Sequence, residues 1–220
     1  MTLPDPPVPF PDDVPTTPVA RIPLWRVWHP TADTASATQM RHFGPLHRFD
    51  PHPAGPAAEH PQHVVWYGAQ QFEVALLEVH NRDTPAAALL GVTPPVSICR
   101  SVRASLVTVV RDPCVFDLTN PDHRDALGAP AELGTAVTAD YRVQQGWSRQ
   151  LRAARGVDGI RYPSARSTHV NGVACALLRS KIGTVTAQHL LIDDTLWPLV
   201  VMALDSAGLA WQVVDRCPRC

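Results

Sequence analysis

The chain has 220 residues, which favours a single domain, and its 45% hydrophobic and 18% charged content is typical of a globular protein with a packed core. Its net charge of −1 at pH 7 excludes a sequence-wide basic surface for nucleic acid, so we expect no direct nucleic-acid partner. Of the nineteen basic residues only Lys181 is a lysine. A GC-rich genome would give this bias, and so would sites that need the planar, permanently charged fork of arginine.

The N-terminal 23 residues contain eight of the 23 prolines, so they can form neither a helix nor a central strand. They lack the basic and apolar regions of a secretory signal. We interpret residues 1–23 as a proline-rich arm that is either disordered or packed on the domain. No run of 18 apolar residues is present, and five scattered cysteines do not form a disulfide framework. We therefore expect a cytoplasmic protein without a membrane partner.

The predicted elements begin with a strand at 24–29, a loop at 30–62 and a second strand at 63–68. A helix is predicted over 70–80, because Phe72, Ala75, Leu76 and Val79 recur at helical spacing and form one apolar face. The later elements are a β-rich stretch at 98–110, a short strand at 115–119, a helical or irregular segment at 121–136, a helix at 140–155, strands at 159–162, 173–179 and 185–192, a helix at 195–206 and a strand at 209–214. This order predicts an α+β fold, a mixed domain of short strands with surrounding helices over residues 24–215, followed by a tail at 216–220.

Two groups of residues resemble metal ligands. Cys217 and Cys220 form a lone CxxC, and His42, His47, His52, His60 and His63 lie close together in the predicted loop. A structural zinc site needs four ligands, and neither group has partners at a matching spacing. We therefore expect a frayed tail and a polar loop, with no metal. Glycine-rich phosphate loops, HExxH and GxSxG are also absent from the sequence.

Three segments carry the residues that point to a function. They are LWRVW at 24–28, FGPLHRFDP at 43–51 with HVVWYGAQQFEVALLEV at 63–79, and GVDGIRYPSAR at 156–166. Read together and in this order, they resemble the RES domain, a family named for its Arg, Glu and Ser residues. The resemblance covers roughly residues 22–180.

The family's residues are matched one at a time. Arg26 matches the arginine of the N-terminal strand, Tyr67 the tyrosine at the end of a strand, Glu78 the glutamate of the following helix and Ser164 the serine of the Gly-Ile-x-Tyr-Pro-Ser context. Arg48 matches the arginine of a Gly-Arg-Trp-Asn stretch, which here reads His47-Arg48-Phe49-Asp50. His47 and Phe49 depart from the pattern and bear on the shape of the pocket. The span from Glu78 to Ser164 is also long for the family, with the extra length expected near 80–110, where it bears on substrate access.

The resemblance implies an ADP-ribosyltransferase-like fold that takes NAD as its substrate and cleaves it by phosphorolysis, by hydrolysis or by ADP-ribosyl transfer to a protein. It also implies a toxin of a bacterial toxin–antitoxin pair, with a helix-turn-helix antitoxin as its partner. The sequence does not choose among water, phosphate and a protein side chain as the acceptor. A catalytically inactive RES-fold module that binds NAD or a partner stays open as the alternative, motivated by His47, Phe49 and the arm.

The chemistry of NAD cleavage gives each matched residue a task. Breaking the nicotinamide–ribose bond passes through an oxocarbenium-like state, which a carboxylate such as Glu78 stabilises. A guanidinium, from Arg26 or Arg48, suits the pyrophosphate. Tyr67 and Ser164 suit stacking and hydrogen bonding to the nicotinamide and the ribose. We therefore expect Glu78, Arg26 and Ser164 to be catalytic, and Arg26, Arg48, Tyr67 and Ser164 to bind NAD.

Overall fold

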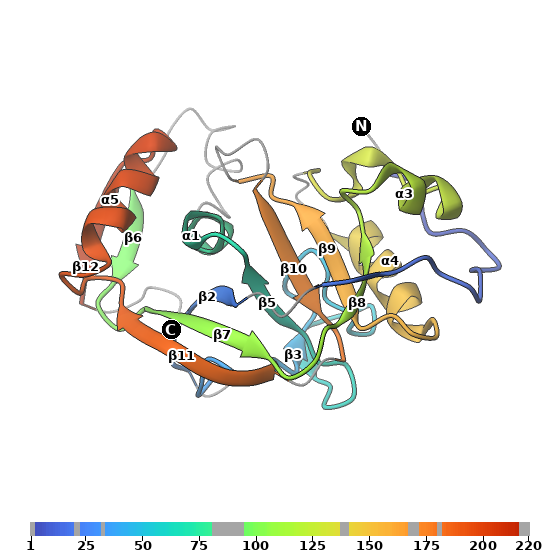
Figure 1. The fold of residues 1–220 in the computed structure, drawn as a ribbon, viewed down its shortest axis with the longest axis horizontal. Coiled ribbons are helices and arrows are strands. Elements are labelled where there is room, and N and C mark those ends of the chain that lie inside the picture. The colour runs from blue at the N-terminus through green and yellow to red at the C-terminus, as the bar shows by residue number, and fades with distance from the viewer. Residues whose placement is uncertain are drawn as a thin grey trace.

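A computed structural model describes residues 3–19, 23–31, 34–80, 95–136, 141–166, 172–179 and 182–215. Within these ranges the chain forms one eight-stranded sheet, two two-stranded sheets and helices on the sheet faces and at the ends (Figure 1). The mixed α+β prediction is confirmed. None of the helices in these ranges is long and apolar enough to cross a membrane.

The large sheet brings together strands that are far apart in the sequence. Its order is β1-β8-β9-β10-β5-β2-β7-β11, and neighbours are antiparallel except for the parallel pair β8 and β9. The strands are β1 (Thr17–Pro18), β2 (Leu24–Trp28), β5 (Trp66–Ala69), β7 (Arg103–Val109), β8 (Cys114–Asp117), β9 (Gly159–Pro163), β10 (Val173–Leu177) and β11 (Ile182–Leu190). The segments singled out in the sequence contribute β2, β5 and β9, and β10 lies between β9 and β5, so all three segments meet near the middle of the sheet.

Helix α1 (Phe72–His80) lies between the sheet and α5 (Trp197–Ser206), as Figure 1 shows. Its fully buried residues are Val74, Ala75, Leu76 and Leu77. The predicted apolar face is therefore only partly right, because Phe72 and Val79 are half-buried and Val74 and Leu77 are core residues. Packing on both the sheet and α5 explains why the helix buries more than one face.

The β-rich stretch at 98–110 divides between two sheets. β6 (Val96–Cys99) pairs in parallel with β12 (Trp211–Val214), whereas β7 joins the large sheet after a turn. In Figure 1, β6, β12 and α5 lie together at one end of the molecule.

Of the extra length expected near 80–110, residues 81–94 lie outside the described residues. In its described residues, the predicted loop at 30–62 contains the small sheet of β3 (Phe43–Gly44) and β4 (Ala58–Glu59) and isolated β-bridges.

The segment 121–153 forms α3 (Pro121–Leu127), a short 3-10 helix η1 (Ala131–Leu133) and α4 (Arg142–Ala153). Helix α4 buries Trp147 and Leu151 and turns polar side chains toward the segment that contains Arg48. The Gln145 amide donates to the His47 carbonyl at 3.1 Å, and the Ser148 hydroxyl donates to the Phe49 carbonyl at 2.8 Å. Helix α4 thereby fixes the backbone on both sides of Arg48.

Residues 3–19 of the arm pack on the domain, which decides between the two alternatives for this part of the arm. Its apolar side chains Leu3, Val14 and Val19 are buried, and β1 pairs with β8 at the edge of the sheet. The Phe10 ring lies edge-on to Trp147, whose indole N–H donates to the Pro4 carbonyl at 3.1 Å. The arm therefore supports α4 from outside. The predicted tail at 216–220, with its CxxC, lies outside the described residues.

Candidate active site

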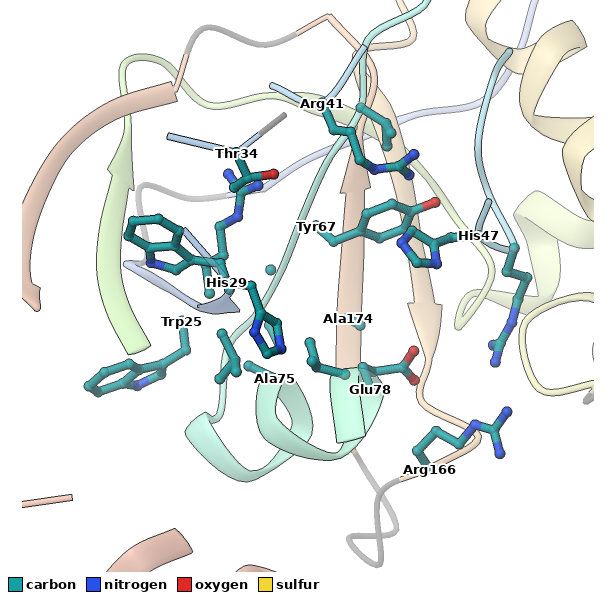
Figure 2. Close-up of a pocket in the computed structure, with 18 of the residues that line it drawn as sticks. Trp25, His29, Thr34, Arg41, His47, Tyr67, Ala75, Glu78, Arg166 and Ala174 are labelled. Atoms are coloured by element: carbon teal, nitrogen blue, oxygen red, sulfur yellow. The ribbon is translucent and has the colours of Figure 1, made fainter. Parts of the chain in front are cut away.

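A cavity of about 270 Å³ lies where β2, β5 and β10 meet α1 (Figure 2). Four arginines and one glutamate contribute to its wall: Arg26, Arg41, Arg48, Arg166 and Glu78. Among the described residues of the wall, Glu78 supplies the one carboxylate. In Figure 2, Glu78 and Arg166 lie near each other, while Arg41 lies farther away beyond Tyr67. The excess of positive charge suits an anionic ligand.

Arg26 is buried on β2 and is anchored by one side of its guanidinium. Its Nη1 donates to the carbonyl oxygens of Ala37 at 2.8 Å and Gln39 at 2.7 Å, and the guanidinium lies 5.4 Å from the centre of the Trp66 ring. Burial, and then the charge of Arg41, lower the pKa of Arg26. Burial and the neighbouring charge therefore penalise the cation, and a bound anion would relieve that penalty.

Asp50 is fully buried and organises one side of the cavity. Its Oδ1 accepts from Arg41 Nη2 at 2.5 Å and from the Tyr67 hydroxyl at 2.8 Å. Its Oδ2 accepts from the backbone N–H groups of Leu46 at 2.5 Å and His47 at 2.9 Å. One carboxylate thus fixes two side chains of the cavity wall and the turn that precedes Arg48.

Ionisation of these groups follows from the same contacts. Burial acts to raise the pKa of Asp50, but the charges of Arg41 and His47 and the donated hydrogen bonds outweigh it, so the pKa is lowered. Burial, and then the Asp50 charge, raise the pKa of Tyr67 well above its usual value. Asp50 is therefore an anion and Tyr67 a neutral phenol over the physiological range.

Arg48 lines the cavity from the segment that α4 holds. Its Nη1 donates to the Gly134 carbonyl, and its guanidinium lies 5.7 Å from the centre of the Tyr162 ring. Burial, and then the charge of Glu78, raise the pKa of Tyr162 well above its usual value. Tyr162 is thus a neutral aromatic surface between Arg48 and Glu78.

Glu78 and Ser164 meet at the end of α1, 86 residues apart in the chain. The Ser164 hydroxyl donates to Glu78 Oε1 at 2.6 Å and accepts from the Arg166 backbone N–H at 3.2 Å. The Ser164 backbone N–H donates to the Gly172 carbonyl at 2.8 Å, which continues the β9–β10 pairing. Ser164 is therefore placed to orient the Glu78 carboxylate, from behind the wall of the cavity.

Arg166 is buried beside Glu78. Burial lowers the pKa of Arg166, whereas Tyr141 and Glu78 act in the opposite direction. Arg166 and Glu78 together give this end of the cavity charges of both signs, whereas the end at Arg26 and Arg41 is cationic.

The structure brings Arg26, Arg48, Tyr67 and Glu78 into the wall of one cavity, with Ser164 hydrogen-bonded to Glu78. Four further residues belong to the site and were not predicted from the sequence: Arg41, Asp50, Tyr162 and Arg166. Asp50, Tyr162 and Arg166 lie inside the segments that were singled out, so their closeness in sequence to the matched residues could have indicated them. Arg41 lies outside these segments, and nothing in the sequence indicated it.

His47 and Phe49, which depart from the family pattern, lie in different parts of the domain. His47 lies edge-on to Tyr67, with ring centres 5.7 Å apart, and lines the cavity. Phe49 is fully buried and packs 4.7 Å from the Tyr162 ring, in the core behind the cavity. His47 is therefore the departure that changes the shape of the wall.

Across the part of the chain that the structure describes, no three His, Cys, Asp or Glu side chains are arranged to hold a metal.

Comparison with known proteins decides the family. The model of the RES domain matches residues 23–201. The chain belongs to the RES domain family. The match begins where the arm ends, so the cavity, α1 and the Glu78–Ser164 contact all lie in the RES domain, whereas residues 3–19 precede it.

Solved structures agree on the fold of this RES domain. A chain of the crystal structure of the M. tuberculosis MbcT–MbcA toxin–antitoxin complex superposes with a TM-score of 0.52 at 18% identity, over 84% of the present chain and 92% of that chain. At this identity the likeness is one of fold. No curated protein sequence matches the chain.

Proposed function

We propose that this RES domain is an NAD-consuming enzyme that cleaves the bond between nicotinamide and ribose. The observation that carries the proposal is one cavity whose described wall combines four buried arginines with a glutamate that a serine holds in place. NAD needs both features, because its diphosphate is anionic and its reacting ribose becomes cationic in the transition state. Residues 24–215 form the proposed catalytic domain.

Arginines of the cavity wall bind the diphosphate. Arg26 has a buried guanidinium that is anchored through Nη1, and Arg48 is held between Gly134 and Tyr162. Anchored guanidinium groups lose little freedom when they bind phosphate, which favours tight, oriented binding. Tyr67 offers its ring to the nicotinamide or the ribose, since its hydroxyl is already donated to Asp50.

Glu78 acts on the ribose. As the nicotinamide–ribose bond breaks, its electron pair leaves on the nicotinamide nitrogen, and positive charge develops at the ribose carbon and ring oxygen. The Glu78 carboxylate stabilises this charge and accepts a hydrogen bond from a ribose hydroxyl, while Ser164 keeps it oriented. The acceptor oxygen then attacks the ribose carbon and gives up its proton if it carries one.

The same cleavage serves three acceptors. Water would yield ADP-ribose, inorganic phosphate would yield a phosphorylated ADP-ribose, and a protein side chain would yield an ADP-ribosylated protein. Nicotinamide leaves in all three cases, so the acceptor is identified from the second product.

We further propose that the protein is a cytoplasmic toxin whose activity is blocked by an antitoxin with a helix-turn-helix. The structural neighbour comes from a toxin–antitoxin complex, which supports this kind of partner. A gene for a small helix-turn-helix protein beside this one, whose product binds the chain and stops NAD cleavage, would support the pairing.

The experiment is to incubate the purified protein with NAD, with and without phosphate, and to follow nicotinamide release. The mass of the second product identifies the acceptor. We expect nicotinamide release, and intact NAD in the presence of folded, partner-free protein would refute the proposal. NAD that binds without turnover would instead support the inactive binding module.

A further inference from the structure

The cavity contains an arginine that the resemblance to RES domains does not assign. Arg41 is nearly buried, with 11% of its side chain exposed, and it lines the cavity. Its Nη1 donates to the Phe43 carbonyl and its Nη2 donates to Asp50 Oδ1 at 2.5 Å. A guanidinium has five N–H donors, and Arg41 donates to these two acceptors among the described residues. Arg41 therefore keeps donors for a ligand while its position is fixed.

Arg41 and Arg26 belong to one structural unit. The carbonyls that anchor Arg26 come from Ala37 and Gln39, in the segment that leads directly to Arg41. That segment is tied to the strand region of Val65 by a reciprocal pair of backbone hydrogen bonds at Arg41, of 2.8 and 3.0 Å. The segment that carries Arg41 thus also anchors the Arg26 guanidinium, and both residues line the same cavity.

Asp50 holds Arg41 from the interior and does not itself face a ligand in the cavity. It is fully buried, and within the described structure it is not part of the cavity wall. Arg41 lines the wall, so its guanidinium is presented to a ligand while the balancing carboxylate stays in the interior. A carboxylate that accepts four hydrogen bonds is well suited to hold a guanidinium in one orientation.

We propose that Arg41, positioned by Asp50, binds the substrate's diphosphate together with Arg26. This rests on the proposed function, because a diphosphate is the substrate group that two neighbouring guanidiniums would recognise. Arg41 is a binding residue, whereas Asp50 is a positioning residue that acts through Arg41, Tyr67 and the turn at Leu46 and His47.

The test separates a binding role from a merely structural ion pair. The double variant Arg41→Gln/Asp50→Asn replaces the ion pair with an amide pair that keeps a hydrogen bond and loses both charges. The matched control is Arg161→Gln/Asp117→Asn, which alters a 2.9 Å arginine–aspartate pair that does not line the cavity. Binding of ADP-ribose, which carries the diphosphate and has no nicotinamide to lose, is measured by calorimetry on variants shown to be folded by circular dichroism.

The proposal predicts that the Arg41/Asp50 double variant binds ADP-ribose about tenfold more weakly than the wild type, since it loses a charge-assisted contact. The control should bind within about twofold of the wild type. Arg41→Lys keeps the charge that Asp50 needs and is expected to weaken binding about threefold, because the fork is lost; it carries the test if the double variant fails to fold.

Three outcomes would overturn the assignment of Arg41: unchanged ADP-ribose affinity in the double variant, unchanged affinity in Arg41→Lys, or no binding of ADP-ribose to the wild type. Failure of the proposed function looks different, because a wild type that binds ADP-ribose through Arg41 and leaves NAD intact would refute NAD cleavage alone.

Discussion

Among the described residues, the arginine–aspartate pairs Arg41–Asp50 and Arg161–Asp117 use the same chemistry in different surroundings. Each is a close contact, of 2.5 and 2.9 Å, and each carboxylate also accepts from other groups. Arg41 lines the cavity, whereas Arg161 lies on β9 outside the cavity wall. An ion pair by itself therefore does not indicate function, whereas the surface to which its guanidinium is presented does.

Alanine at either aspartate should give the largest loss of stability. Asp50→Ala leaves the nearly buried Arg41 uncompensated and is expected to lower the free energy of unfolding by about 3–5 kcal/mol. Asp117→Ala leaves Arg161, which is only half-buried, and is expected to cost somewhat less. Urea titration measures this loss. In protein that remains folded, only Asp50→Ala should also weaken ADP-ribose binding. Equal weakening by Asp117→Ala would mean that the two pairs are equivalent.

Glu78→Gln should produce the largest loss of activity without a matching loss of stability. The variant removes the negative charge that faces the developing cation, so kcat for nicotinamide release should fall about a hundredfold to a thousandfold. Glu73→Gln is the matched control on the same helix, outside the cavity wall, and should leave kcat within about twofold. A Glu78→Gln variant that keeps wild-type kcat would contradict the role of this carboxylate.

Ser164→Ala should have an intermediate effect on activity. The variant deletes the 2.6 Å hydrogen bond to Glu78, so the carboxylate is less well oriented, and kcat is expected to fall about tenfold with little change in KM. Steady-state kinetics separates the two parameters. A change confined to KM would instead indicate that Ser164 contacts the substrate directly.

The acid limb of the stability curve should report on Asp50. Its pKa is lowered in the folded state, so its contribution is present above the unfolded-state pKa of about 4 and is lost as the pH falls through the lower folded-state pKa. Asp50→Asn should therefore flatten the loss of stability that occurs as the pH falls below about 4. Denaturant titration at each pH measures this dependence. If wild type and variant lose stability equally as the pH falls, protonation of Asp50 does not cause the loss.

Phe10→Ala should have the smallest effect, because it acts on the arm. The loss of the edge-on contact with Trp147 is expected to lower the free energy of unfolding by about 1 kcal/mol. Val8 is 92% exposed, so Val8→Ala is the control and should be neutral. Equal effects of the two substitutions would mean that the arm does not depend on this contact.

Much of the fold could be predicted from the sequence because each element has its own periodic pattern. The helix at 70–80 and the strand at 24–29 were placed within two residues of α1 and β2. The second buried side of α1 could not be predicted, because it depends on α5, which follows more than a hundred residues later. The division of 98–110 between two sheets depends in the same way on pairing with β12 and β11.

The site was only partly predictable for a related reason. Arg26, Arg48, Tyr67, Glu78 and Ser164 stood in segments that resemble a family, whereas Arg41 lies in a loop without periodicity or motif. The contact between Asp50 and Arg41 joins residues nine apart in irregular chain, and local sequence gives no rule for such a contact. The positive character of the cavity therefore emerges only when β2, β5 and the loop are assembled.

The most direct test of the account is a crystal structure of the Glu78→Gln variant with NAD. The account predicts NAD in the cavity between β2, β5, β10 and α1, with its diphosphate within hydrogen-bonding distance of Arg26 and Arg41. The ribose that bears nicotinamide should lie against the side chain at position 78. NAD bound elsewhere on the domain, or bound with its diphosphate away from both arginines, would contradict the account.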